Sequence, residues 1–200
     1  MNLEKISALL DEADVDYVES GGNLVVVLPG ERRLKTNCLF IPQEGMFRVE
    51  AFVCRAVEEA QEEVYRLLLQ ANRRTYGVHY TLDGNNDIYL VGQFGESTTA
   101  EDIQRILGQV LERADGDFNR ILERGFESSI RHEWAWRLSR GEPTFNLGAF
   151  QRLRPTDEEV DRLAPMPGKS PREVVAEQAA AAPAEAEGKT SKETTDQDAE

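Results

Sequence analysis

The sequence has few of the residues that build disulfide frameworks and metal centres. Its 200 residues include two cysteines and two histidines. Two cysteines cannot form a disulfide framework, so we expect reduced thiols in a cytoplasmic protein. Cys38 lies inside an apolar strand pattern and Cys54 ends another, which is typical of small buried side chains. The histidines, His79 and His132, do not stand at zinc-ligand spacing from each other or from a cysteine. We therefore expect no metal site.

A long apolar run is also missing. No stretch of about 18 apolar residues occurs, which argues against a membrane-spanning helix. The first residues, MNLEKISALLDEADVD, carry acids where a secretory signal peptide needs an apolar segment, so we expect no export. A net charge of −14 and a pI near 4.7 argue against nonspecific binding to nucleic acid or to an anionic membrane.

Aromatic residues are absent after residue 164, where Ala, Pro and Glu dominate. Residues 155–200 hold 12 acidic and 5 basic residues. Such a segment cannot bury enough apolar surface to offset an ordering cost of roughly 1–2 kcal/mol per residue. The sequence therefore predicts an acidic low-complexity tail over residues 155–200 that is mostly disordered.

The first part of the chain reads as one helix followed by strands. Apolar residues at helical spacing predict a helix over residues 2–12. Strand patterns separated by turn residues then predict strands over 15–19, 24–28, 34–41 and 46–54. In the last of these, Phe47, Val49 and Ala51 alternate with Arg48 and Glu50. One face of this sheet is therefore expected to be buried and the other at least partly wet.

A helix over residues 57–71 follows, with Glu58 and Glu59 in its expected first turn, where the helix dipole favours acids. Two strands over 76–82 and 88–94 then flank the turn sequence DGNND and predict a hairpin.

Thr98 and Glu101 have capping-box spacing ahead of a long apolar stripe that runs from Ile103 to Leu122. Gly116 is expected to bend or interrupt this helix. A further helix over 126–140 ends at the sequence Gly-Glu-Pro.

This order of elements predicts an α+β fold. Strands joined by short turns cannot be parallel neighbours, so we expect an antiparallel sheet of five to six strands with helices packed on it. The expected division is an α+β domain over residues 1–125, a C-terminal helical extension packed on it over 126–154, and the tail over 155–200.

Two stretches carry a resemblance to a known family. They are LKTNCLFIPQEGMFRVEAFVCRAVEEA and YGVHYTLDGNNDIYLVGQFGESTTAEDIQRILGQVLERADGDF. Over about residues 1–154 the chain resembles the YbjN family of bacterial proteins, whose fold is similar to that of type III secretion chaperones. The run ERGFESSIRHEWAWRLSRGEPTFNLGAFQRLRP resembles the C-terminal extension of actinobacterial members. The resemblance implies a regulator of sensory transduction and a surface that holds extended partner segments, often in homodimers. It implies no catalytic residue.

Motifs for phosphate, calcium and catalysis are missing. No P-loop or complete dinucleotide fingerprint occurs. Asp83 and Asp87 give residues 83–94 a superficial likeness to a calcium loop, but Phe94 stands where the bidentate Glu is required. We therefore predict no cofactor, no catalytic residue and no enzymatic activity. An enzyme with an unrecognised site is the alternative.

The segment 120–154 holds seven arginines and four glutamates, with tryptophans among them. This pattern also occurs in stacking platforms for single-stranded nucleic acid, which is a second alternative, although the charge of the whole chain argues against it. Trp134 shares the apolar stripe of its helix and is expected in the core, whereas Trp136 points elsewhere. It either packs on the FNLGAF segment or faces a partner. We name Trp136, Arg137 and Arg140 as candidate residues for binding an unidentified protein partner.

Overall fold

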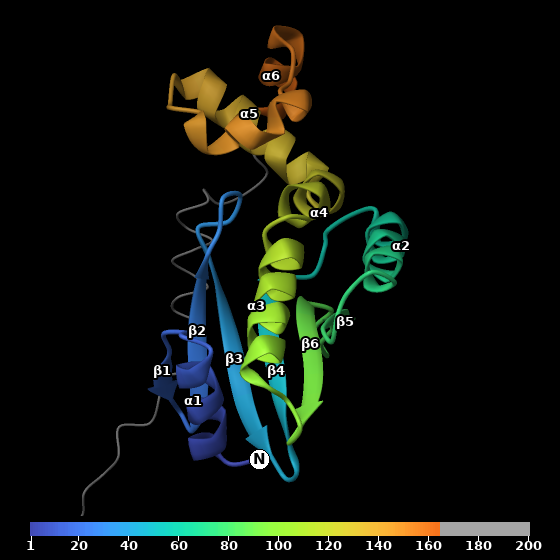
Figure 1. Cartoon of the computed structure of the whole chain (residues 1–200). Coiled ribbons are helices and arrows are strands. Elements are labelled where there is room, and N and C mark those ends of the chain that lie inside the picture. Colours follow the sequence, from blue (N-terminus) through green and yellow to red (C-terminus); the bar gives the residue numbers. More distant parts are fainter. Residues whose placement is uncertain (165–200) are drawn as a thin grey trace, which may run out of the picture. The chain divides into compact units, whose positions relative to one another are not determined.

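The computed structural model describes residues 1–164, so residues 165–200 of the tail predicted over 155–200 lie outside the described residues. Six strands form one antiparallel sheet in the order β1-β2-β3-β4-β6-β5, with helices packed against it (Figure 1). The predicted α+β class and the antiparallel sheet are confirmed.

The first elements follow the predicted order. They are α1 (Leu3–Glu12), β1 (Val18–Ser20), β2 (Asn23–Pro29), β3 (Lys35–Gln43) and β4 (Met46–Cys54). Gly21 and Gly22 connect β1 to β2 with φ values of 58° and 76°, in the left-handed region that glycine enters without steric cost. This tight hairpin leaves β1 with only three residues.

Helix α2 (Gln61–Asn72) starts later than its apolar spacing predicts. Glu58 and Glu59 lie ahead of the helix, because Ala60 has a φ of 49° that regular helix does not allow. Their backbone N–H groups donate to the carbonyl oxygen of Gly125 at 2.9 and 3.2 Å. A contact between distant parts of the chain therefore sets the helix start.

The hairpin of β5 (His79–Leu82) and β6 (Ile88–Gly95) comes next. Its turn is organised by the Asp83 carboxylate, which accepts hydrogen bonds from the backbone N–H groups of Asn85 and Asp87, each at 2.8 Å. Asp83 therefore shapes a turn, as we infer from the sequence, whereas the Asp87 carboxylate accepts a hydrogen bond from the Ala56 N–H at 2.7 Å.

The long predicted helix is divided into α3 (Ala100–Ala114) and α4 (Phe118–Gly125). At Gly116, a Cβ atom would stand 2.2 Å from the carbonyl oxygen of Glu112, so this position requires glycine. The neighbouring Asp115 carboxylate accepts hydrogen bonds from the β2–β3 loop. The interruption expected at Gly116 is therefore present.

The predicted capping box is displaced by one residue. Thr99, rather than Thr98, is the N-cap of α3, and its side chain accepts from the N–H of Asp102. The Asp102 carboxylate in turn accepts from the Thr99 N–H at 3.1 Å. Asp102 therefore takes the acceptor position of the capping box that the sequence pattern assigned to Glu101.

Three elements complete the described chain: α5 (Glu127–Arg140), the 3₁₀ segment η1 (Phe145–Leu153) and α6 (Asp157–Leu163). Gly141 ends α5 with a φ of 65°. Helix α6 lies beyond the boundary expected at residue 154, and the Arg131 guanidinium of α5 binds its Glu159 carboxylate at 2.7 Å. Residues 157–163 are thus helical and pack on α5, although their composition alone groups them with the tail.

The main core lies between one face of the sheet and the helices α1 and α3, which lie over that face (Figure 1). Its fully buried side chains include Ile6, Leu10, Leu24, Val26, Phe40, Phe47, Val49, Leu90, Ile103, Ile106 and Val110. A smaller cluster joins Trp134 of α5 to Leu147 and Phe150 of η1.

Candidate partner-binding surface

The face of the sheet opposite α1 and α3 carries exposed and half-buried side chains, and within residues 1–164 no helix packs over it. We call this surface the open face. Its residues are Val25, Val27, Leu39, Ile41, Arg48, Glu50, Phe52, Tyr89 and Val91. They alternate along each strand with the buried residues, because successive side chains of a strand point to opposite faces.

Strand register places the apolar members of the open face side by side. Val25 pairs with Leu39, which pairs with Glu50, which in turn pairs with Val91. In this row, apolar side chains from β2, β3 and β6 therefore flank one carboxylate on β4. Such rows arise only from pairing between distant segments of the chain.

Aromatic side chains extend the apolar surface. The rings of Phe52 and Tyr89 meet edge to face with centroids 5.3 Å apart. Phe52 remains 37% exposed and Val27 remains 50% exposed, so both retain apolar area that a partner could cover. Burial of such area contributes roughly 25 cal/mol per Å². The surface can thus supply binding energy.

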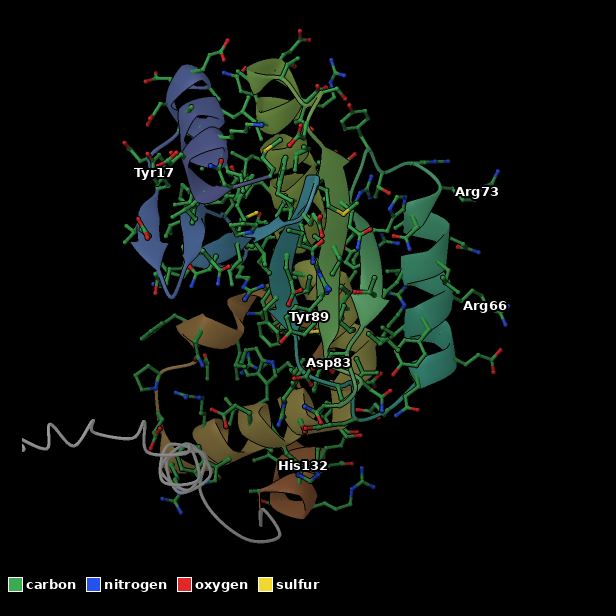
Figure 2. All side chains as sticks on the ribbon, turned by 90° about the horizontal axis from the view of Figure 1, so that it is seen from below. Tyr17, Arg66, Arg73, Asp83, Tyr89 and His132 are labelled. Carbon is green, nitrogen blue, oxygen red and sulfur yellow. The ribbon has the colours of Figure 1, made fainter. Side chains whose placement is uncertain are left out.

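Polar groups on the open face are held in fixed positions. The Arg48 guanidinium lies 2.6 Å from the Glu50 carboxylate along the same strand. Partial burial and the nearby carboxylates of Asp83, Asp87 and Glu50 raise the pKa of Tyr89. Figure 2 shows Tyr89 and Asp83 close to each other in this part of the sheet. The phenol therefore stays protonated and can donate a hydrogen bond.

The two sheet edges differ in their ability to accept another strand. At the β5 edge, the Asn72 side chain accepts from the Tyr80 N–H at 2.8 Å and donates to the Tyr80 carbonyl at 3.3 Å. Backbone groups that an added strand would need are thus already paired. The β1 edge is exposed but only three residues long. The open face consequently offers more surface to a partner than either edge.

The candidate residues predicted from sequence lie on α5. Trp136 is half-buried, and the guanidinium of Arg140 lies over its ring, 4.8 Å from the centroid. Arg137 binds the Glu133 carboxylate at 2.6 Å and donates to the Pro143 carbonyl at 2.9 Å. The structure therefore brings Trp136 and Arg140 together, whereas Arg137 holds the end of its own helix.

Trp134 is buried as its place on the apolar stripe predicts. It is 1% exposed, packs against Leu147 and Phe150, and donates its indole N–H to the Phe150 carbonyl at 3.3 Å. Trp136 is not part of this cluster, and the neighbouring Phe145 is 85% exposed. The FNLGAF segment therefore covers Trp134, through Leu147 and Phe150.

Ion pairs and stacking engage six of the seven arginines of the segment 120–154. Four of these arginines bind carboxylates: Arg120 binds Asp117, Arg131 binds Glu159, Arg137 binds Glu133, and Arg152 binds Glu123. Arg140 and Arg154 lie over tryptophan rings. A continuous strip of unpaired bases, which single-stranded nucleic acid would require, is therefore not formed by the described residues.

Residues 1–164 contain no cluster of three side chains that could hold a metal ion. Both cysteines are buried and unpaired, and burial raises the pKa of each thiol to about 12. A thiolate nucleophile at neutral pH is consequently not favoured at either position. The same residues contain no helix long and apolar enough to cross a membrane.

Sequence comparison identifies relatives of this chain. Residues 2–123 match the family model YbjN, described as "Putative bacterial sensory transduction regulator". An uncharacterized protein of Mycobacterium tuberculosis H37Rv is 60% identical over 134 residues, which cover 66% of this chain and 73% of that protein. One from Mycobacterium leprae is 50% identical over 163 residues, covering 78% of this chain and 88% of that protein.

Solved structures with a similar fold include a chain of the ExoU–SpcU complex from the type III secretion system of Pseudomonas aeruginosa. It is 16% identical, covers 59% of this chain and 98% of that chain, and has a TM-score of 0.46. YbjN from E. coli is 15% identical, covers 59% of this chain and 89% of that chain, and has a TM-score of 0.43. The family match spans the whole sheet together with α1, α2 and α3. The resemblance read from the sequence is therefore confirmed, and the chain belongs to the YbjN family.

Proposed function

We propose that this protein is a non-enzymatic regulatory module that binds a protein partner on the open face of its sheet. The observation that supports this is the open face itself, where the half-buried Val25, Leu39 and Val91 flank Glu50 and no helix lies over them in the described residues. Exposed apolar surface rimmed by polar groups commonly serves recognition. The membership of a family described as regulatory is in keeping with this role.

The occupant that suits this surface is an amphipathic helix of the partner. Asn72 closes the β5 edge to strand addition, and β1 offers only three residues, so docking on the face is favoured over docking at an edge. An apolar helix face would cover Leu39, Phe52 and Val91. Polar residues at its border would meet Arg48 and Glu50, the ion pair within the surface.

Trp136 and Arg140 form a second proposed contact. Their stacked pair combines a flat apolar ring with a cation, a combination that is common where proteins recognise each other. Arg137 would contribute indirectly, because its bonds to Glu133 and Pro143 fix the end of α5.

The chemistry of the described residues supports a role without catalysis. The one buried carboxylate–phenol pair joins Asp117 to Tyr80, and burial and that carboxylate raise the pKa of Tyr80, which keeps the phenol protonated. It cannot act as a base near neutral pH. Free, buried thiols at Cys38 and Cys54 suit the reducing cytoplasm, where we place the protein.

The test is affinity capture with three forms of the full chain. The native lysate comes from a mycobacterium that carries a relative of this protein. The unmodified chain, the open-face variant Leu39→Glu/Val91→Glu and the control Leu69→Glu are compared. Leu69 is 67% exposed on α2 and lies outside the open face. A protein retained by the unmodified chain and the control, but lost from the open-face variant, is the expected result.

Two measurements complete this experiment. Sedimentation velocity tests whether a second copy of this chain occupies the open face. If the unmodified chain and the control are dimers and the open-face variant is a monomer, the occupant is a second copy and not a partner helix. Thermal melting verifies that all three forms are folded. Identical captured proteins with all three forms would contradict the proposal.

A further inference from the structure

A second surface, separate from the open face, lies between α2 and the junction of α3 with α4. It is a cleft of about 1030 Å³. Residues that line it are Glu62, Glu63, Arg66, Leu67, Gln70, Ala71, Arg73, Arg74, Glu112, Arg113, Asp117, Arg120 and Arg124. The volume is that of a site for a ligand of nucleotide or drug size.

The charge of this cleft is opposite to that of the chain. Six arginines line it against four carboxylates, in a protein whose net charge is −14. Arg66, Arg113 and Arg120 bind carboxylates on neighbouring turns. Arg73, Arg74 and Arg124 make no ion pair with any residue of the range 1–164. Three guanidinium groups are thus available to an external anion.

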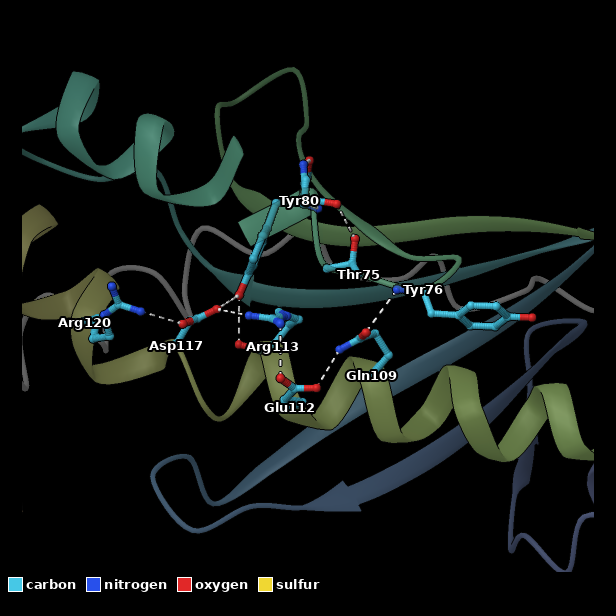
Figure 3. A network of polar contacts seen from close by, with 9 residues as sticks. Thr75, Tyr76, Tyr80, Gln109, Glu112, Arg113, Asp117 and Arg120 are labelled. Atoms are coloured by element: carbon cyan, nitrogen blue, oxygen red, sulfur yellow. Dashed lines mark hydrogen bonds and ion pairs between the residues drawn. The ribbon is translucent and has the colours of Figure 1, made fainter. Parts of the chain in front are cut away.

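A buried network fixes the inner wall of the cleft (Figure 3). The Asp117 carboxylate binds two guanidinium groups. Its Oδ2 lies 3.3 Å from Arg113 Nη1, and its Oδ1 lies 3.2 Å from Arg120 Nη1. The Tyr80 hydroxyl lies 3.2 Å from the first of these oxygens and donates to the Arg113 carbonyl at 2.8 Å. Asp117 is 6% exposed, so its negative charge is compensated by its neighbours inside the protein and contributes little to the surface of the cleft.

The opposite wall is α2 and the residues that follow it. Figure 2 shows the Arg66 and Arg73 side chains on the outer side of α2, so they stand at the outer rim of the cleft. Arg74 and Arg124 come from the two walls, and neither binds the Asp117 carboxylate, although the Arg124 guanidinium donates to the Arg120 carbonyl at 3.2 Å. Their removal therefore tests the cleft while leaving the ion pairs of Asp117 intact.

We propose that this cleft binds a small molecule that carries several phosphate groups. Guanidinium groups pair with phosphate oxygens through two parallel hydrogen bonds, and Arg73, Arg74 and Arg124 offer such groups beside a wall that the Asp117 ion pairs hold in place. The carboxylates of Glu62, Glu63 and Glu112 interrupt the basic lining, which disfavours a long polyanion such as nucleic acid. A compact oligophosphate, whose charges lie close together, needs only the few arginines that this cleft supplies.

The experiment is isothermal titration calorimetry of the full chain with sodium tripolyphosphate. Single inorganic phosphate and a hexaglutamate peptide serve as comparison ligands, and the salt concentration is held constant. The test variant is Arg74→Gln/Arg124→Gln. The matched control is Arg105→Gln/Arg162→Gln, which removes two exposed arginines that do not line the cleft.

The expected result is saturable one-to-one binding of tripolyphosphate that weakens at least tenfold in the test variant and less than threefold in the control. Unchanged thermal melting of the test variant would assign this loss to the ligand contacts. Equal weakening in both variants, hexaglutamate binding as tight as that of tripolyphosphate, or no saturable binding to the unmodified chain would overturn the proposal.

Discussion

The side chain of Asn72, the last residue of α2, forms two hydrogen bonds with the backbone of Tyr80 at the edge of the sheet. Its Oδ1 accepts from the Tyr80 N–H at 2.8 Å and its Nδ2 donates to the Tyr80 carbonyl at 3.3 Å. The amide thus takes the place that the backbone of an added strand would occupy. An unprotected edge is a template for association, so this contact both joins α2 to the sheet and protects β5.

Asn72→Ala should therefore destabilise the fold by about 1–3 kcal/mol, because the partly buried N–H and carbonyl of Tyr80 lose their partners. It should also increase self-association through the freed edge. Urea unfolding and sedimentation velocity measure the two effects. Gln70→Ala, an exposed change on the same helix, is the control. Indistinguishable results for the two variants would show that the amide does not protect the edge.

The N-terminus of α3 gives a prediction that separates neighbouring threonines. Thr99→Ala removes the two hydrogen bonds of the Thr99 hydroxyl, one accepted from the Asp102 N–H and one donated to the Asp102 carboxylate, and should cost about 0.5–2 kcal/mol. Thr98→Ala removes one exposed bond to the Gly95 carbonyl and should cost less than half as much. Denaturant melts of both variants check the order, and a greater loss for Thr98→Ala would place the cap where the sequence pattern predicts it.

The two tryptophans of α5 should respond differently to truncation. Trp134→Ala empties a fully buried position and should cost about 3–5 kcal/mol. Trp136→Ala should cost clearly less, because this ring is half-buried beneath Arg140 and outside the Trp134 cluster. Guanidinium melts give the stabilities, and the capture experiment shows whether Trp136 contacts a partner. Equal large losses would make both residues purely structural.

Asp115 predicts a pH dependence of stability. Burial opposes its charge, but hydrogen bonds from the N–H groups of Arg33 and Arg32 outweigh burial and lower the pKa of this carboxyl. A group with a lowered folded pKa stabilises the fold above its unfolded pKa, about 3.9, and this contribution disappears as pH falls through the folded value.

Asp115→Asn should accordingly lose stability near pH 7 and show a shallower decline between about pH 5 and pH 2. Urea midpoints across this range measure the effect, with the exposed Asp161→Asn as control. A decline parallel to that of the unmodified chain would mean that the charge of Asp115 does not stabilise the junction of α3 with α4.

Thiol reactivity tests the burial of the cysteines. Burial raises the pKa of Cys38 and of Cys54 to about 12, so both should react with Ellman's reagent far more slowly in the native protein than in urea at pH 8. The release of chromophore over time gives the rates. Fast reaction of one thiol in native conditions would identify it as accessible and reopen the question of its chemistry.

Local residue patterns are sufficient to predict the class of the fold and most of its elements. Alternation along β4 and the short turns dictate an antiparallel sheet with one wet face, because side-chain direction in a strand has a period of two. Helical spacing marks α1 and α5 and places Trp134 in the core. The Gly21–Gly22 and Asp83–Asp87 turns depend on local residue chemistry, so they too can be read directly.

Contacts between distant residues decided the rest. The rows of the open face, the start of α2 at Gln61 and the closure of the β5 edge all depend on partners many positions away in the chain. Whether an arginine is paired can depend in the same way on which helix lies opposite, as Arg131 of α5 illustrates by binding the Glu159 carboxylate of α6. Local periodicity fixes which way a side chain points along its own element, and only packing fixes what that side chain meets.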